Sequence, residues 1–260
     1  EAGLAGLAGV RHRGAVAADR RTSDGCGLLS AIPATVAPPG TVVAMLFWRG
    51  EHPERAVAET AGTVGLAVAS LRTPPTDPSV LGDIARREQP RFLQVLLVPG
   101  TDTDAGDPDA IERQAWRFRR ALRRNAPDIY VASCSARSIV HKGLIPAEHL
   151  ADFWVDLADP ATVGSFAVFH QRFSTNTDPT WERAQPFRAL CHNGEINTIS
   201  GNERRLLARS HLGTASAGLG EEEGLRPILD TADSDSGKLD EVVELLCRGG
   251  RDVCHAVAMV

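Results

Sequence analysis

The sequence predicts an α+β fold in which sheets and helices form layers, and two observations carry this prediction. Eight short runs are rich in β-branched or aromatic residues and are bounded by turn formers, as strands are. They cover residues 41–48, 66–71, 92–98, 129–134, 137–141, 165–171, 187–192 and 253–260. Helical patterns lie between some of these runs, but hairpins outnumber strand–helix–strand units. We therefore expect an α+β or layered α/β/β/α domain and not a doubly wound sheet.

Local signals justify the individual elements. Only Ser135 and Ala136 separate the runs 129–134 and 137–141, which predicts a hairpin. Helices are expected over 53–61, 108–124, 197–212 and 235–247, the last ending at Gly249-Gly250. The chain opens in a small-residue helical pattern and ends inside a predicted strand. We therefore expect it to be part of a longer protein.

Composition excludes several classes of protein. The chain has 260 residues, is 43% hydrophobic and carries 28 Lys+Arg against 33 Asp+Glu, a formal charge of −5. This size and composition support a sizeable core, and the mildly acidic balance argues against a general nucleic-acid or acidic-membrane binder. The longest apolar run, 42–48, is too short to span a bilayer. An odd, scattered set of five cysteines indicates reduced thiols in a cytoplasmic setting, and singly placed histidines argue against a metal site.

The polar stretch 170–177 follows the apolar run 166–169. Arg172 stands at the end of this predicted buried strand, where an unpaired charge would be costly. The planar guanidinium suits a carboxylate, which can come from an internal Asp or Glu or from a ligand.

Two further patches allow a structural and a functional interpretation. Asn193-Gly194 is a strong turn signal, but an Asn side-chain amide beside a Gly backbone N–H can also form an oxyanion hole. The segment 233–236 precedes a predicted helix, so it can simply cap that helix, or its Asp235 can hold a ligand ammonium. A fourth patch, 12–27, contains Gly25 and Gly27, which suggest a tight turn or a close backbone approach; it does not match a phosphate-binding loop.

Taken together and in this order, the patches resemble the class II glutamine amidotransferase domain at the N-terminus of glutamate synthases. The similarity rests on Arg-Phe-Ser-Thr-Asn-Thr at 172–177, Trp181, Gln-Pro-Phe-Arg at 185–188, His-Asn-Gly-Glu-Ile-Asn-Thr at 192–198 and Gly201-Asn202. Supporting matches lie at 12–15, 23–25, 132–143, 234–236 and 239–240.

The resemblance implies the N-terminal-nucleophile hydrolase fold, a four-layer α/β/β/α sandwich of two mainly antiparallel sheets. It also implies roles for residues at the matching positions. Arg172 would bind the α-carboxylate of glutamine with Thr175 nearby, and Asp235 would pair with its α-ammonium. Asn193 and Gly194 would form the oxyanion hole, and no metal would be bound.

In this family an N-terminal Cys thiolate attacks the glutamine amide, and the free α-amine of that Cys serves as the base. None of the five cysteines occupies this position, and Cys26 and Cys191 are expected to pack. We expect residues 1–260 to be a partial amidotransferase domain, with the nucleophile strand before Glu1 and further sequence after Val260. Such a piece would fold poorly and be inactive alone. The alternatives are a non-catalytic glutamine-binding or regulatory module and a related class II amidotransferase.

The resemblance also implies partners and cofactors. The substrate would be L-glutamine, and a synthase region beyond Val260 would transfer the ammonia to 2-oxoglutarate. That region would use FMN and an iron–sulfur cluster, with either a pyridine nucleotide or ferredoxin as electron donor; this domain itself would hold no cofactor. The resemblance allows a small electron-transfer subunit as a further partner, but no nucleic acid and no membrane.

Overall fold

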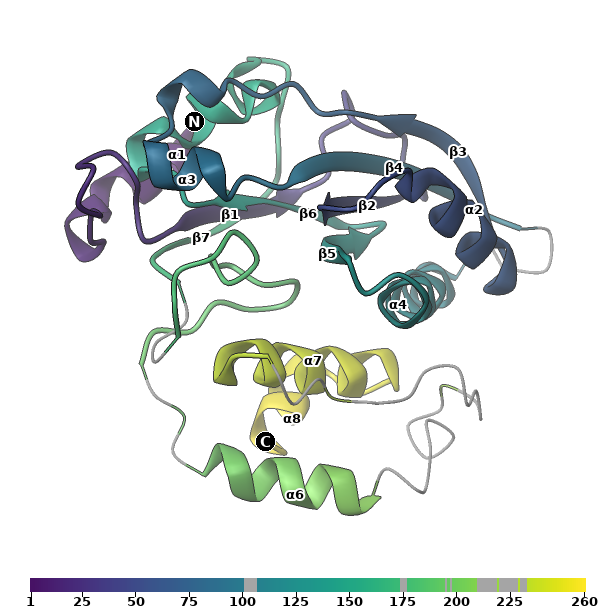
Figure 1. The fold of residues 1–260 in the computed structure, drawn as a ribbon. Coiled ribbons are helices and arrows are strands. Elements are labelled where there is room, and N and C mark those ends of the chain that lie inside the picture. The colour runs from purple at the N-terminus through teal and green to yellow at the C-terminus, as the bar shows by residue number, and fades with distance from the viewer. Residues whose placement is uncertain are drawn as a thin grey trace.

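A computed structural model describes residues 1–100, 107–173, 177–194, 196, 198–209, 219, 229 and 233–260. It confirms the predicted α+β sandwich of two antiparallel sheets with helices (Figure 1). The first sheet has the order β6-β1-β7, formed by β6 (Ser138–Gly143), β1 (Cys26–Ala31) and β7 (Ala167–Gln171). The second has the order β3-β4-β2-β5, formed by β3 (Leu66–Arg72), β4 (Arg91–Pro99), β2 (Val42–Trp48) and β5 (Ile129–Ser135).

Strand β2 lies between two hydrophobic cores. Alternate residues of a strand point to opposite faces. Val42, Ala44 and Leu46 pack with the helices α2 (Pro53–Thr63) and α4 (Pro108–Asn125). The intervening side chains, such as Met45, join a core that includes Leu28 of β1 and part of α1 (Ala2–Gly9). Both faces of β2 are therefore buried, which explains why its sequence is apolar throughout.

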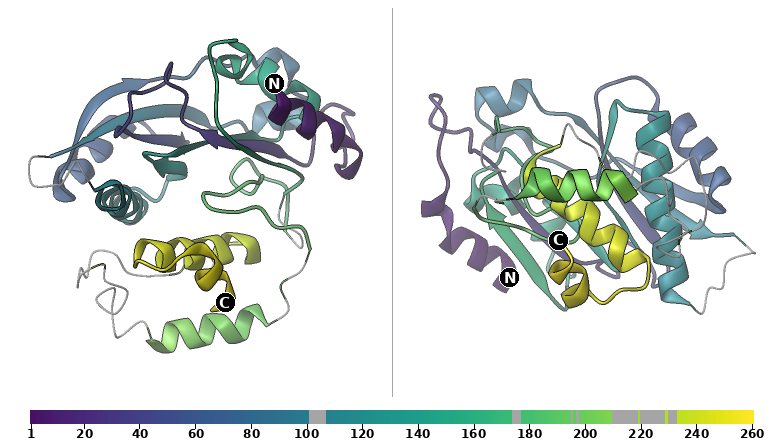
Figure 2. Two further views of the ribbon diagram at one scale, coloured as in Figure 1. Left: turned by 180° about the vertical axis from the view of Figure 1, so that it is seen from behind. Right: turned by 90° about the horizontal axis from the view of Figure 1, so that it is seen from below.

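Three helices form a separate group beside α4 (Figures 1 and 2). These are α6 (Ile199–Arg209), α7 (Asp235–Arg248) and α8 (Val253–Ala258), while the short α3 (Asp83–Arg87) and α5 (Leu150–Phe153) lie on the opposite side of the sheets. Helix α7 contacts α4 through buried ion pairs, among them Arg119 with Glu244 and Arg120 with Glu241. Among the helices of the described residues, none is long and apolar enough to cross a membrane.

The predicted hairpin at 135–136 is wrong, because β5 and β6 belong to different sheets. A two-residue hairpin turn favours residues that tolerate positive φ, and Ser-Ala does not supply one. Instead, Glu112 Oε1 accepts a hydrogen bond from Ala136 N (2.7 Å), and Ser135 Oγ accepts one from Arg137 N (2.9 Å). These side chains stabilise a corner at which the chain passes from one sheet to the other.

The expected strand at 253–260 is also wrong, because this segment forms helix α8. Asp252 caps the helix by accepting a hydrogen bond from His255 N (2.9 Å). The run 187–192 is not a strand either, and β1 was not expected from the sequence.

Candidate active site

Arg172 lies directly after β7, at the end of the three-stranded sheet. Its backbone N–H donates to Gly25 O (2.7 Å), and its φ is +109°, in a region that residues with a side chain rarely adopt. Its Nε donates to Asp24 Oδ2 (3.0 Å), and the side chain is 47% exposed. Asp24 is therefore the internal partner that the sequence left as one alternative, but the described contacts leave the terminal amino groups of the guanidinium available to a ligand.

Gln185 connects the Arg172 segment to the loop that carries Asn193 and Gly194. Its backbone N–H donates to Arg172 O (3.4 Å). Its side chain binds the backbone of His192 twice: Oε1 accepts from His192 N (2.8 Å), and Nε2 donates to His192 O (3.1 Å). Because a buried amide with both ends bonded has one orientation, Gln185 determines where the chain enters the Asn193-Gly194 turn.

The Asn193-Gly194 turn lies at the protein surface. Both residues are exposed, and Gly194 has a φ of +129° that favours glycine. The backbone N–H of a residue in such a turn can point away from the protein, next to the side-chain amide of the preceding Asn. This arrangement suits the binding of a developing oxyanion.

The N-terminus of α7 approaches the same loop. Ser234 caps the helix by accepting from Gly237 N (3.2 Å), and Asp235 is the first helical residue. Ser236 Oγ lies 3.4 Å from His192 Nδ1, one residue before the Asn193-Gly194 turn. Asp235 therefore stands at a helix end that is in contact with the loop.

The structure thus connects the segments of Arg172, Asn193-Gly194 and Asp235 through Gln185 and Ser236. Among the hydrogen bonds and ion pairs of the described residues given above, none joins Arg172, Asn193 and Asp235 directly to one another. Thr175 lies outside the described residues. The sequence placed Gln185 and Ser236 within the matching strings 185–188 and 234–236, but it did not identify either as a connecting residue.

Four of the five cysteines lie in environments that disfavour a reactive thiolate. Burial raises the pKa of Cys26, Cys134, Cys191 and Cys247 above the ordinary value of a thiol. A nucleophilic cysteine needs the opposite shift. These four thiols therefore suit packing, as expected for Cys26 and Cys191.

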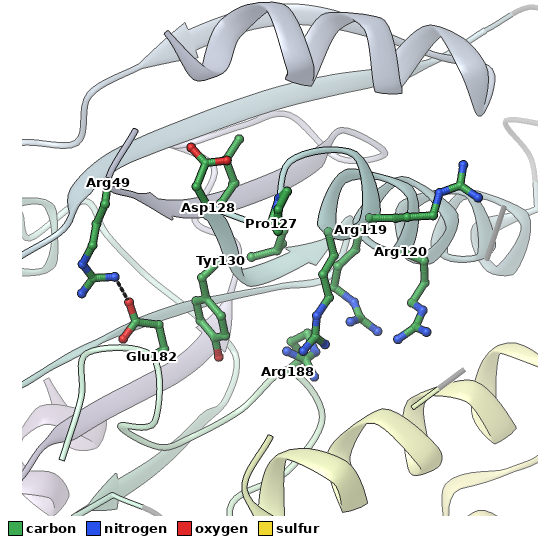
Figure 3. A pocket seen from close by; sticks show the side chains of 12 residues that line it. Arg49, Arg119, Arg120, Pro127, Asp128, Tyr130, Glu182 and Arg188 are labelled. Atoms are coloured by element: carbon green, nitrogen blue, oxygen red, sulfur yellow. Dashed lines mark hydrogen bonds and ion pairs between the residues drawn. The ribbon is translucent and has the colours of Figure 1, made fainter. Parts of the chain in front are cut away.

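Two cavities lie in the described part of the protein, and neither is lined by the predicted ligand-binding residues Arg172, Asn193, Gly194 and Asp235. One, of about 560 Å³, is lined by Gln171 and the segment around Gly14. The other, of about 620 Å³, lies beside α4 and is lined by arginines, Tyr130 and Glu182 (Figure 3). Because several of these arginines pair with carboxylates of α7 or with Glu182, we assign no ligand to this cavity. Within the described part of the chain, no group of three or more His, Cys, Asp or Glu side chains could hold a metal ion.

Comparison with known proteins agrees with the resemblance drawn from the sequence. The family model described as "Glutamine amidotransferases class-II" matches residues 1–260. The chain is 37% identical over 280 residues to ferredoxin-dependent glutamate synthase 2 of Synechocystis, which covers 100% of this chain and 18% of that protein. It is 35% identical over 281 residues to the chloroplastic ferredoxin-dependent glutamate synthase of Oryza sativa. That alignment covers 99% of this chain and 17% of the relative. It is 36% identical over 282 residues to the large chain of the glutamate synthase [NADPH] of Bacillus subtilis. That alignment covers 99% of this chain and 18% of the relative. The chain therefore spans less than a fifth of the length of these relatives.

Proposed function

Since the chain belongs to the class-II glutamine amidotransferases, we propose that it is the domain of a glutamate synthase that hydrolyses glutamine to glutamate and ammonia. The observation that carries this proposal is the connection of three chemically distinct groups by Gln185 and Ser236. A guanidinium, a pair of amide donors and a carboxylate match the α-carboxylate, the reacting amide and the α-ammonium of one glutamine.

In the proposed mechanism, the residues of this chain bind glutamine and stabilise charge. The terminal amino groups of Arg172 bind the α-carboxylate, with Thr175 nearby, and Asp235 pairs with the α-ammonium. The amide oxygen becomes negatively charged when a nucleophile adds to the amide carbon. Asn193 and Gly194 then donate hydrogen bonds to this oxygen, and such bonds are strongest in the transition state.

We propose that the nucleophile is an N-terminal Cys of the full-length protein, outside these 260 residues. Its α-amine, with a pKa of about 8, accepts the thiol proton. The thiolate forms a thioester as ammonia leaves, and water then releases glutamate. We accordingly expect the 260-residue chain alone to be a partial, inactive domain.

We further propose that the ammonia is transferred to 2-oxoglutarate in a synthase region after Val260. FMN and an iron–sulfur cluster would supply the reducing electrons there, with or without a small electron-transfer subunit. We propose that both cofactors belong to that region and not to this domain.

The first test is glutamine hydrolysis by the full-length protein and two variants. Arg172→Lys should raise the KM for glutamine at least tenfold, because an ammonium lacks the planar fork. Asn193→Ala should lower kcat by about 10²–10³ with little change in KM, because an oxyanion donor acts in the transition state.

Arg183→Lys provides a matched control on the same segment, since the described contact of its guanidinium is to Asp178 O (3.4 Å). We expect unchanged kinetics for this variant. A full-length protein that neither hydrolyses glutamine nor forms glutamate from glutamine and 2-oxoglutarate would contradict the proposal.

A further inference from the structure

The loop before Asn193 is held by a side chain of α7 and not by a neighbouring strand. Asp240 Oδ1 accepts hydrogen bonds from Ala189 N (2.7 Å) and Leu190 N (3.2 Å). Within the loop, Phe187 N donates to Leu190 O (2.9 Å). One carboxylate oxygen thus orders the turn that lies three residues before Asn193.

The second carboxylate oxygen of Asp240 pairs with the residue preceding this turn. Its Oδ2 lies 2.8 Å from Nη2 of Arg188, and Arg188 Nε lies 3.5 Å from Oε2 of Glu244. Asp240 is 0% exposed, and Arg188 is also buried, between Arg119 and α7 (Figure 3). Burial raises the pKa of Asp240, whereas Arg188 and the amide of Ala189 oppose this shift by stabilising the carboxylate.

A buried ion pair of this kind is weak support for stability alone. The desolvation of two charges can exceed their attraction, so apolar residues of similar volume often serve the fold equally well. A carboxylate that also accepts hydrogen bonds from two backbone N–H groups has an effect on the backbone that an apolar residue cannot have. It specifies the orientation of the peptide groups to which it is bonded.

Helix α7 therefore contacts the segment that leads into the predicted oxyanion turn at two points. Asp240 holds residues 188–190, and Ser236 approaches His192, while Asp235 stands five residues before Asp240 on the same helix. Five residues correspond to a rise of about 7.5 Å. One rigid element thus relates the proposed ammonium ligand to the turn that carries the proposed oxyanion donors.

We propose that Asp240, together with Arg188, is a positioning residue for glutamine hydrolysis. It does not touch the substrate but holds the 188–190 turn so that Asn193 and Gly194 face the amide oxygen. This inference rests on the proposed function of the chain.

The expected kinetic effect follows from when each interaction forms. A displacement of donors by about 1 Å can cost on the order of 10² in rate. Oxyanion donors act mainly in the transition state, whereas the α-carboxylate and α-ammonium contacts already form in the bound substrate. Loss of Asp240 should therefore lower kcat and leave the KM for glutamine nearly unchanged.

The test compares Asp240→Asn with Glu241→Gln in the full-length protein. Asp240→Asn keeps the volume but directs an amide donor at Arg188, or else at the two backbone N–H groups. Glu241 is the next residue of α7, is as deeply buried, and its described ion pairs run to Arg119, Arg120 and Arg123 of α4. Glu241→Gln therefore reports the general cost of disturbing the ionic cluster.

We expect Asp240→Asn to lower kcat 10- to 100-fold with KM within threefold of the wild type, and Glu241→Gln to leave both within threefold. If Asp240→Asn does not yield folded protein, Arg188→Lys is the variant to measure. It should lower kcat by a smaller factor, again with KM within threefold of the wild type. Equal kcat values for Asp240→Asn and Glu241→Gln, or a rise in KM without a fall in kcat, would overturn the inference. A wild-type protein without glutaminase activity would instead overturn the proposed function.

Discussion

Arg172 combines a ligand-binding side chain with a backbone conformation that is unfavourable for it. A non-glycine residue at such a φ costs on the order of 1–3 kcal/mol and persists only where the surroundings impose it. Here Gly25 O accepts from its N–H and Asp24 orients its Nε. The residue type and its position at a strand end were predictable from the sequence. The strain was not, because it depends on partners almost 150 positions earlier in the chain.

Lys142 of β6 is the most deeply buried cation of the described residues. Its Nζ donates to Tyr130 Oη (2.9 Å) and to Glu182 O (2.7 Å), and it lies 4.9 Å from the ring centres of Tyr130 and Phe187. Burial lowers its pKa to about 7 from the ordinary 10.5. The folded protein therefore holds a buried charge at low pH and releases its proton near neutrality.

We predict that Lys142→Met removes a pH dependence of stability. Between pH 7 and the ordinary lysine pKa, the unfolded chain binds one more proton at this site than the folded protein. The wild type should therefore gain stability relative to the variant as pH rises from 7 to 8.5, by up to ~1.4 kcal/mol per pH unit. Calorimetric melting of this domain within the full-length protein at pH 6.5, 7.5 and 8.5 measures the difference.

Lys238→Met is the matched control, since Lys238 is the other lysine of the chain and pairs with Glu203 (2.6 Å) at a less buried site. It should retain the wild-type pH dependence in this range. Parallel stability curves for the wild type and Lys142→Met would contradict the prediction.

At the level of elements, the sequence predicted those whose signals are local. The buried strand β2 and the capped helices α4 and α7 have their own apolar pattern and cap residues, and they lie where expected. Strand β1 was missed because Cys26-Gly-Leu-Leu-Ser-Ala31 has low β-propensity. A Cβ at Gly27 would lie 2.8 Å from Gln185 O and 2.6 Å from Lys142 Cβ, so the glycine serves a close approach that the local sequence does not reveal.

Helix α8 was predictable in principle. The apolar residues at 253, 256, 257 and 260 have the spacing i, i+3, i+4, i+7 of one helix face, and Asp252 stands at the cap. The β-branched residues favoured the wrong interpretation. The loop 187–192 was not predictable in the same way, because Asp240 and Gln185 bind backbone groups that a neighbouring strand would otherwise bind.

We predict that Asp252→Ala loosens α8. Loss of an N-cap costs ~0.5–2 kcal/mol, so amide exchange over 253–258 should accelerate by roughly fivefold. Hydrogen–deuterium exchange of the full-length protein measures this effect, and strand β2 should remain unchanged. Asp252→Asn keeps a capping oxygen and should exchange like the wild type; equally rapid exchange in both variants would show that the cap is not the cause.

At the level of the whole molecule, the site draws on segments between 24 and 240 that only the tertiary structure connects. The sequence identified the candidate ligand groups because each residue type suggests its own chemistry. It could not identify Gln185 or Asp240 as connecting residues, because their partners lie in other elements. The sequence also could not reveal the ionic contacts between α4 and α7, because the paired residues lie in different elements. These contacts join the helical group to the sandwich.

These contacts predict how α7 responds to acid. Burial raises the pKa of Glu241 and Glu244, but nearby arginines outweigh this effect, and both pKa values lie below the ordinary 4.5. The ion pairs therefore stabilise the protein above about pH 4.5 and are lost as pH falls through the lower, folded-state values. The pKa of Asp240 is raised instead, so its contribution to stability is present at low pH and is lost as pH rises.

We expect acid to release α7 before the sheets unfold. Trp116 of α4 packs against Leu245 of α7, so its emission should shift to longer wavelength when the helix leaves. Difference fluorescence between the wild type and Trp116→Phe isolates this signal, while far-ultraviolet circular dichroism follows the sheets. Glu244→Gln removes one carboxylate and should move the Trp116 transition to higher pH. If both signals changed at one pH in the wild type and in Glu244→Gln, α7 would unfold only together with the sandwich, and the buried ion pairs would not control its docking.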